Sequence, residues 1–573
     1  MKTSTRALSH VSLCTLAFIV VPATAAPPTF TKDVAPILFR HCLRCHRAGD
    51  IATNVSFSSY DATRPWAKAI KEKVLRHEMP PWPADPNASV KFRNDRRLSQ
   101  AEIDTLVAWV NSGAAKGKDI DLPPKPTFAH GWEHPEGLEP DLVIAMPQQF
   151  DVPAWGSIPY VRYLVRVPLS EDRWVAALQV LPENPAVVHH MAITEITLDK
   201  GVRPEDLNAL ALIARQQGFQ NFLPGSHPAV TAPGNAIAVD MLGVYTPGTT
   251  LETYPGDSAK LIKGGDGAYI NFNIHYQTIG RAARDRSRIG LWFRSTPPKH
   301  QLFRIPGATK TILVNGAEIL SDARGRKAEG TGAVIPPIPP YEASYEVTGI
   351  TAYTEPIVIY QFQPHAHVRC KDFKYTVVYP DGRDQVVLSV PKYDFSWQLA
   401  YDLETPLQLP SGSKLIVTAH YDNSVNNKSN PAPDQPVYFR DAENQSLDEM
   451  FTPFIQYSSS SRDSARESDV AAGLQSDVEL AEVDGCLVSS SGSWMLTKAS
   501  GPIATGDQAA SSIELKAAAS RAPGGEVFHL LGVDFFGPAR HSGQRVAVKG
   551  AWTKGTSSVN VTSLQPLGLA CHN

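Results

Sequence analysis

After residue 21 the sequence has no apolar run that reaches the roughly 20 residues a membrane-spanning helix needs. We therefore expect a mature protein without a stable membrane span. Charge is also scarce, because charged residues make up 19% of the chain, the net charge is −3, and no basic block stands out. A nucleic-acid-binding surface needs clustered Lys and Arg, so no nucleic-acid partner is expected.

The long apolar run at the N-terminus indicates a signal peptide over residues 1–25. Lys2 and Arg6 supply positive charge, the apolar run covers residues 7–21, and Ala23-Thr24-Ala25 offers a small-residue cleavage site after Ala25. A membrane anchor is the alternative, but the run is shorter than the roughly 20 residues of a span. We expect a periplasmic or secreted protein.

Six cysteines are present, and Cys14 leaves with the signal peptide. Cys486 and Cys571 bracket the C-terminal region and could form a disulfide in an oxidising compartment. Cys42 and Cys45 belong to a motif described below. This leaves Cys370, which we expect to be buried and unpaired.

Residues 28–118 are expected to be mostly helical. Residues 99–102, Ser-Gln-Ala-Glu, form a capping box that begins a helix, and Gly113 is placed to end it. A linker rich in Pro, Gly and Lys follows over residues 116–137. The predicted apolar stripe of the helix consists of Ile103, Leu106, Val107 and Val110.

From about residue 138 to 480 helix-length patterns are scarce, and β-branched and aromatic runs alternate with turn dipeptides. The runs predicted as strands include Tyr160–Val167, Ala268–His275, Ile357–Phe362, Phe373–Tyr379 and Lys414–His420. This pattern favours sandwich or jelly-roll sheets. We expect a mainly-β core of two jelly-roll halves, residues 138–300 and 301–480, with the Pro- and Gly-rich residues 321–345 as a loop between halves.

The tail, residues 483–573, has its own predicted strands, including Gln544–Val548 and Ser558–Val561. We expect a small β-barrel there. The predicted fold class is thus multidomain: a small all-α domain, the mainly-β core and this barrel. No internal sequence repeat is present.

Residues 42–46 contain Cys-x-x-Cys-His, the attachment motif of c-type haem. Cys42 and Cys45 on one helical turn would bind the porphyrin edge as thioethers, and His46 would be the proximal iron ligand. A zinc site or a redox Cys-x-x-Cys is the alternative. The stretch resembles small cytochrome c domains, in which a methionine before the last helix is the sixth ligand. Met79 occupies that position, with His77 as the alternative ligand.

Three groups of His and Met residues lie in the β region, each weak alone because a single His or Met on a strand is usually core. They are His189-His190-Met191, then His275, then His365-Ala366-His367 with the later Met450. His365 and His367 would point from one face of a strand. His189 and His190 can share an ion only at a bulge or a strand end. Imidazole suits copper, zinc and iron, and a thioether favours Cu(I).

In this order the groups resemble the copper type II, ascorbate-dependent monooxygenases, the family of the peptide-amidating and dopamine-hydroxylating enzymes. The resemblance covers about residues 140–460, and it includes the contexts His275-Tyr276, Pro380-Asp381-Gly382 and Asp448-Glu449-Met450. It implies that the core binds two copper ions, one in each jelly-roll half. The electron-transfer copper would be bound by His189, His190 and His275, and the catalytic, oxygen-reacting copper by His365, His367 and Met450.

The sequence departs from the animal enzymes at several motif positions. After His190 it continues Met-Ala-Ile-Thr-Glu-Ile over residues 191–196, where those enzymes continue to Phe and Cys. In the animal enzymes the second motif begins with His and ends with Gly, and here Val358 and Cys370 stand at those positions. Gln363 replaces the arginine that grips a peptide carboxylate in the amidating branch, which disfavours peptide amidation. Bacterial members fused to cytochromes are the closer match.

The expected function is a monooxygenase that uses O₂ and two electrons to hydroxylate a C–H bond, or to oxygenate a sulfur, of a small organic substrate. The covalent haem c would relay or replace an external donor, either an ascorbate-like reductant or a redox protein. One alternative is a copper- and haem-binding electron-transfer protein without oxygenase activity. Another is a structural jelly-roll carrier without a working dicopper site. The residues do not identify the substrate.

Overall fold

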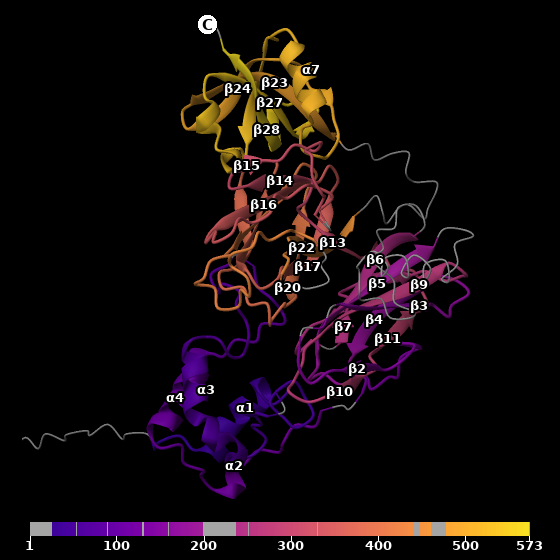
Figure 1. The fold of residues 1–573 in the computed structure, drawn as a ribbon, viewed down its shortest axis with the longest axis vertical. Coiled ribbons are helices and arrows are strands. Elements are labelled where there is room, and N and C mark those ends of the chain that lie inside the picture. The colour runs from indigo at the N-terminus through magenta and orange to yellow at the C-terminus, as the bar shows by residue number, and fades with distance from the viewer. Residues whose placement is uncertain are drawn as a thin grey trace, which may run out of the picture.

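The computed structural model describes most of the chain between residues 26 and 571. Within this range the residues left out are 53, 89, 129–130, 157, 159, 199–235, 250, 329–330, 441–446 and 460–476. The predicted signal peptide, residues 1–25 with Cys14, lies outside the described residues. Four units follow one another along the chain, one helical and three built of strands (Figure 1).

The regular structure of residues 28–118 is helical. The capping box of Ser99 and Glu102 is present, and Gly113 follows the end of α4 with a φ of 99°. In α4, Ile103 and Leu106 are buried as predicted, but Trp109 completes the buried face while Val107 and Val110 are only half-buried. The elements are η1 (Phe30–Val34), α1 (Ala35–His41), α2 (Tyr60–Thr63), η2 (Arg64–Trp66), α3 (Ala67–Leu75) and α4 (Gln100–Asn111).

The first β unit has two main sheets whose facing residues form one hydrophobic cluster. The first sheet contains β1 (Leu142–Ala145), β11 (Arg288–Arg294), β4 (Arg173–Leu181), β8 (Ser258–Ile262), β12 (His300–Gln301) and β7 (Leu251–Thr253). The second contains β3 (Val161–Arg166), β9 (Ala268–Tyr276), β5 (Val188–Leu198) and β6 (Ala236–Tyr245). A short pair, β2 (Phe150–Val152) with β10 (Ala283–Asp285), completes the unit.

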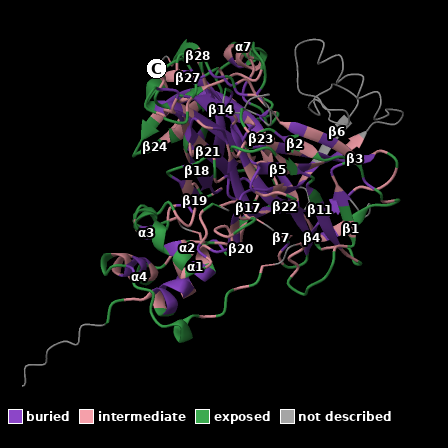
Figure 2. Ribbon diagram, turned by 60° about the horizontal axis from the view of Figure 1, so that its bottom comes forward, coloured by how far each residue is buried: buried purple, intermediate pink, exposed green. Residues whose placement is uncertain are grey.

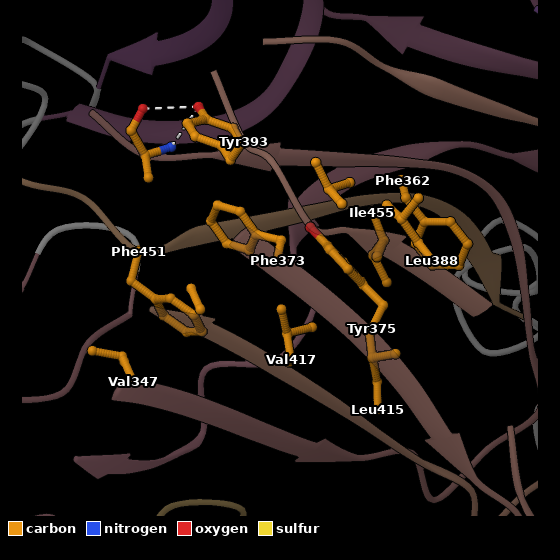
Figure 3. Close-up of a cluster of buried hydrophobic side chains, with 14 of the residues drawn as sticks. Val347, Phe362, Phe373, Tyr375, Leu388, Tyr393, Leu415, Val417, Phe451 and Ile455 are labelled. Carbon is orange, nitrogen blue, oxygen red and sulfur yellow. Dashed lines mark hydrogen bonds between the residues drawn. The ribbon is translucent and has the colours of Figure 1, made fainter. Parts of the chain in front are cut away.

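The second β unit also buries one cluster between two sheets. Phe362 and Ile455 from one sheet meet Val347, Tyr375 and Val417 from the other (Figure 3). One sheet contains β13 (Phe303–Pro306), β22 (Thr452–Ser459), β17 (Ile357–His365) and β20 (Tyr401–Leu409). The other contains β15 (Ala317–Glu318), β14 (Thr311–Val314), β16 (Tyr345–Ala352), β21 (Lys414–Tyr421), β18 (Cys370–Val378) and β19 (Asp384–Val390).

Residues 321–345 do form a loop, but its predicted place between the two halves is wrong. Strands β13, β14 and β15 precede the loop and belong to the sheets of the second unit. The loop therefore lies within that unit. Pro and Gly mark where regular structure stops, and they do not indicate whether the chain then returns to the same sheets.

The C-terminal unit is a ring of paired strands. β24 pairs with both β26 and β23, which closes the order β24-β26-β28-β27-β23. The predicted disulfide between Cys486 and Cys571 is confirmed, with a Cα–Cα distance of 5.7 Å, and Cys370 is a buried free cysteine as expected. The elements are β23 (Val478–Ser490), β24 (Ser493–Ala499), β25 (Ile503–Ala504), α7 (Ser512–Ser520), β26 (Glu526–Leu531), β27 (Gln544–Thr553) and β28 (Ser558–Ala570).

The prediction of a mainly-β protein is confirmed, since each run named above as a strand overlaps one, although the runs Tyr160–Val167 and Phe373–Tyr379 extend one residue beyond β3 at each end and beyond the end of β18. Buried positions concentrate in the strands of the β units, whereas the helices expose one side (Figure 2). Figure 1 shows the helical unit and the C-terminal unit at opposite ends, with the second β unit between them and the first beside it. Among the described residues no helix is long and apolar enough to cross a membrane.

Candidate metal and haem centres

His189 and His190 lie at a β-bulge, one of the two arrangements in which adjacent histidines on a strand can share an ion. The pairing of β5 with β9 shifts register between Val188 and His190, and His190 then pairs with His275. The extra residue turns His189 to the side on which its neighbour lies. All three imidazoles therefore meet at one end of the β5–β9 pair.

The three imidazoles converge through the same ring atom. His189 Nδ1 lies 2.9 Å from His190 Nδ1 and 3.3 Å from His275 Nδ1. Among the described residues this is the one group of three His, Cys, Asp or Glu side chains close enough together to share an ion. His190 Nε2 lies 3.1 Å from the Tyr160 hydroxyl, so its Nε2–H can donate there, which leaves Nδ1 as the unprotonated ring nitrogen.

Burial keeps these imidazoles neutral, as metal ligands must be. Burial lowers the pKa of His189 to about 4. Burial, reinforced by the neighbouring imidazoles, also lowers the pKa values of His190 and His275 well below their usual range. At neutral pH the group therefore presents converging lone pairs and no positive charge, which suits a bound cation.

The second predicted group forms at the end of β17. His365 is its last residue and His367 follows just beyond, with their ring centroids 5.6 Å apart. His367 is buried, and its Nδ1–H donates to the carbonyl oxygen of Asp448 at 2.9 Å. Its Nε2 is buried without a hydrogen-bond partner in the described structure. Burial lowers the pKa of His367 to about 3, so this orphaned nitrogen is an unprotonated lone pair that fits a metal ion.

Met450 is brought to this group by strand pairing. β17 pairs with β22 so that His365 lies opposite Thr452. Met450 lies two residues before Thr452, and the Glu449 carboxylate accepts the backbone N–H groups of both His367 and Met450, which places the two residues at the same end of the β17–β22 pair. Met450 is half-buried. A thioether together with the imidazoles of His365 and His367 is a set of ligands that suits copper.

Two buried side chains hydrogen-bond the backbone that carries the second group. The Glu449 carboxylate accepts hydrogen bonds from the backbone N–H groups of His367 (2.8 Å), Arg369 (2.7 Å) and Met450 (3.3 Å). The Tyr393 hydroxyl accepts from the Ala366 N–H at 3.1 Å and donates to the Ala366 carbonyl at 2.9 Å (Figure 3). These bonds set the backbone on which the donor atoms depend.

The two groups adjoin each other across the two β units. The ring centroids of His190 and His365 are 5.8 Å apart. Gln398 lies between them: its Oε1 accepts from His365 Nδ1–H at 2.5 Å, and its Nε2 lies 3.4 Å from His190 Nδ1. The Phe395 ring packs against imidazoles of both groups. Its centroid lies 4.8 Å from the ring centroid of His189 and 5.9 Å from that of His367.

The haem motif directly follows α1. His46 Nδ1–H donates to the Val55 carbonyl at 2.9 Å, which leaves Nε2 with the lone pair an iron ligand needs. Cys42 and Cys45 are free cysteines, and burial raises the pKa of Cys42 to about 12. A structural zinc site needs four ligands around one ion, and the described residues bring no third ligand to these two cysteines within reach of one ion.

Charged side chains lie near the motif. Burial raises the pKa of Cys45, while the nearby positive charges of Arg44, Arg47 and Arg96 oppose that shift. Arg44 and Arg47 are ion-paired with Glu133 and Asp50, respectively. Met79, the predicted sixth ligand, is half-buried, whereas the alternative His77 is exposed.

Sequence reasoning missed the residues that support the site. Gln398, Phe395 and Tyr393 lie in a loop before β20 that carries no ligand motif, and Tyr160 just precedes β3. Their roles depend on packing between units that no local pattern encodes. Glu449 could have been found from the sequence, because it belongs to the Asp448-Glu449-Met450 context named above.

Comparisons with known proteins add little. No family model matches the chain, and no curated protein matches it. Among solved structures, procruciferin, an 11S globulin from Brassica napus, is similar at 10% identity over 56% of this chain and 83% of that chain, with a TM-score of 0.11. A TM-score this low carries no argument about fold or function.

Proposed function

We propose that this protein is a copper- and O₂-dependent monooxygenase with a fused c-type haem domain that delivers electrons. The observation that carries the proposal is the convergence of three neutral imidazoles, His189, His190 and His275, beside a second group whose His367 Nε2 is a buried lone pair without a partner. The chain thus brings two nitrogen-rich donor sets to one place. Copper bound at both would supply one-electron chemistry toward O₂ and a C–H bond or a sulfur.

The family and domain assignments are part of the same proposal. The chain would be a bacterial-type member of the copper type II monooxygenases, with jelly-roll halves over residues 138–300 and 301–480, a cytochrome c domain over 28–118 and a barrel over 483–573. Two opposed sheets in each half support this division. Export to the periplasm or the exterior is supported by the disulfide of Cys486 and Cys571, because such bonds persist in oxidising compartments.

The residues around the donor atoms prepare them for metal. His367 and His365 both donate their Nδ1–H, to the Asp448 carbonyl and to Gln398, so each keeps Nε2 as the ligand atom. This is the outer-shell hydrogen bonding that fixes the tautomer of metal-binding histidines. At the first group the ligand atoms are instead the converging Nδ1 atoms.

A second candidate function is electron transfer without oxygenation. The contact between His190 and His365 favours it, because metals in adjoining donor sets could exchange electrons without a substrate between them. Phe395 fills space between the two groups. O₂ consumption by the reduced, metal-loaded protein separates this function from the monooxygenase.

Metal analysis and O₂ uptake test the proposal together. We expect two copper ions and one haem per chain, and O₂ uptake in the presence of reductant that rises with a suitable small organic substrate. His189→Ala should lower copper content and uptake, whereas the control His529→Ala, at an exposed position on β26, should change neither. Two coppers with no uptake under any substrate would favour electron transfer, and a copper-free protein would refute both functions.

Covalent haem is a separate prediction. Exported, haem-loaded protein should retain its haem through acid–acetone extraction, because thioethers to Cys42 and Cys45 resist it. Cys42→Ala should leave at most one thioether, visible in the pyridine haemochrome spectrum. The control Cys370→Ala, which changes a buried free cysteine in the second β unit, should keep both. Haem that extracts freely from the parent protein would contradict the assignment.

A further inference from the structure

Between α3 and α4 the chain leaves the helical unit and crosses to the second β unit. We call residues 82–88 and 90–96 the strap. It is hydrogen-bonded beside β20: Arg93 N–H donates to the Asp402 carbonyl and Glu404 N–H to the Lys91 carbonyl, both at 2.9 Å. Figure 1 shows this indigo segment reaching β20.

Aromatic side chains of the strap are buried in the core of the second β unit. The ring centroids of Trp82 and Tyr401 are 5.0 Å apart, edge to face, and Phe92 contacts both rings. Trp82 is 4% exposed and Tyr401 is 1% exposed. The helical unit is therefore joined to the second β unit by a buried aromatic contact.

One end of this contact is close in sequence to the haem-binding residues, because Trp82 follows the predicted iron ligand Met79 by three positions. At the other end of the strap, Arg96 donates to the Gly248 carbonyl at 3.1 Å. A Cβ atom built on Gly248 would lie 2.9 Å from Arg96 Nη1 and 3.7 Å from Cys45 Sγ, so the strap and the haem cysteine meet there.

The other end leads to the histidines. Tyr401 begins β20 and pairs across the sheet with Phe362, three residues before His365. Tyr401 also follows Gln398 by three positions, and the Gln398 amide contacts both His365 and His190. From Tyr401 the backbone runs three residues to Gln398, whose amide then reaches His365 and His190.

We propose that the contact of Trp82 with Tyr401 is the route by which electrons enter the histidine groups from the haem-binding unit, arriving at His365 through Gln398. This inference rests on the proposed function. Each crossing oxidises one ferrous haem to ferric and reduces one copper(II) to copper(I), and no bond is made or broken. The first β unit also meets the strap through a polar contact, the hydrogen bond of Arg96 to the Gly248 carbonyl.

The test measures electron transfer directly in the full-length, haem- and copper-loaded protein. The haem is reduced photochemically without oxygen while copper is oxidised, and its reoxidation is followed by absorbance. Trp82→Leu and Tyr401→Leu should slow this step by about tenfold or more, whereas Trp82→Phe and Tyr401→Phe should retain most of the rate because the ring remains. Trp109→Phe, a buried tryptophan of α4, is the matched control.

Copper content, haem content and haem potential are measured on each sample. Equal rates in all variants with full cofactor content would overturn the route and leave the proposed function standing. Equal slowing by Phe and Leu would show that the contact acts only by docking the units, which also overturns the route. Absence of copper or haem from the parent protein would instead overturn the proposed function and the route with it.

Discussion

His275→Ala should leave the protein with one tightly bound copper in place of two. His275 supplies one of three converging Nδ1 atoms, and two imidazoles alone form an incomplete site. Loss of an outer-shell partner already costs roughly 10- to 100-fold in metal affinity, so loss of a ligand should cost about 100-fold or more at this group. The second group, with His367 Nε2 intact, should remain occupied. Equilibrium titration with Cu(II) and Cu(I) measures both affinities.

Met450→Ala should fail in a different way. The soft thioether is lost while His365 and His367 remain, so Cu(I) should bind more weakly at the second group and Cu(II) should be less affected. O₂ uptake should collapse, because the proposed oxygen-reacting copper lies there. Carbon monoxide binding to the reduced protein reports this site: one equivalent should bind in the parent and in His275→Ala, with an altered stretching frequency in Met450→Ala.

Met191→Ala is the matched control for the methionine. Met191 follows the first pair of histidines but is fully buried in the core of the first β unit. Its loss should cost stability, by about 2–5 kcal/mol, without changing the carbon monoxide signal. Full activity and an unchanged carbon monoxide signal in Met450→Ala would show that Met450 is a packing residue.

The positions of the strands could be predicted because they depend on local patterns of β-branched and aromatic residues. The adjacency of His189 and His190 allowed a shared ion only at a bulge or a strand end, and the register shift shows the bulge. The disulfide followed from the position of two cysteines that nothing else used. The prediction of the buried face of α4 was less accurate, because Trp109 has more apolar area to bury than Val107 or Val110 and takes their place in the core.

Contacts between units could not be predicted in the same way. Gln398 contacts His190 across 208 residues of sequence, and Asn94 of the strap donates to the Ala400 carbonyl across 306. Such contacts depend on how finished units pack, and a Gln or Phe in a loop has no periodicity to reveal it. The position of the strap could not be predicted either. In sequence Trp82 and Phe92 resemble core residues of the helical unit, but they are buried in the second β unit.

Glu449→Ala should disrupt the second group without touching a ligand. The buried carboxylate accepts three backbone N–H groups, including those of His367 and Met450. Removing it leaves three buried donors without partners, at about 1–3 kcal/mol each, so the free energy of unfolding should fall by about 3 kcal/mol or more. The segment carrying His367 should lose its fixed position, and copper at the second group should weaken while the first group keeps its ion.

Two variants separate this positioning role from a general loss of stability. Glu449→Gln keeps one acceptor oxygen but turns an NH₂ group toward backbone donors, so copper binding and the urea midpoint should fall between those of the parent and Glu449→Ala. Asp448→Asn changes the adjacent buried side chain, yet the Asp448 contact to His367 runs through the backbone carbonyl, which remains. Its second-group copper affinity should stay near that of the parent. Equal loss of copper from both groups in Glu449→Ala would indicate unfolding of the core instead, because a positioning residue beside His367 and Met450 acts on one group alone.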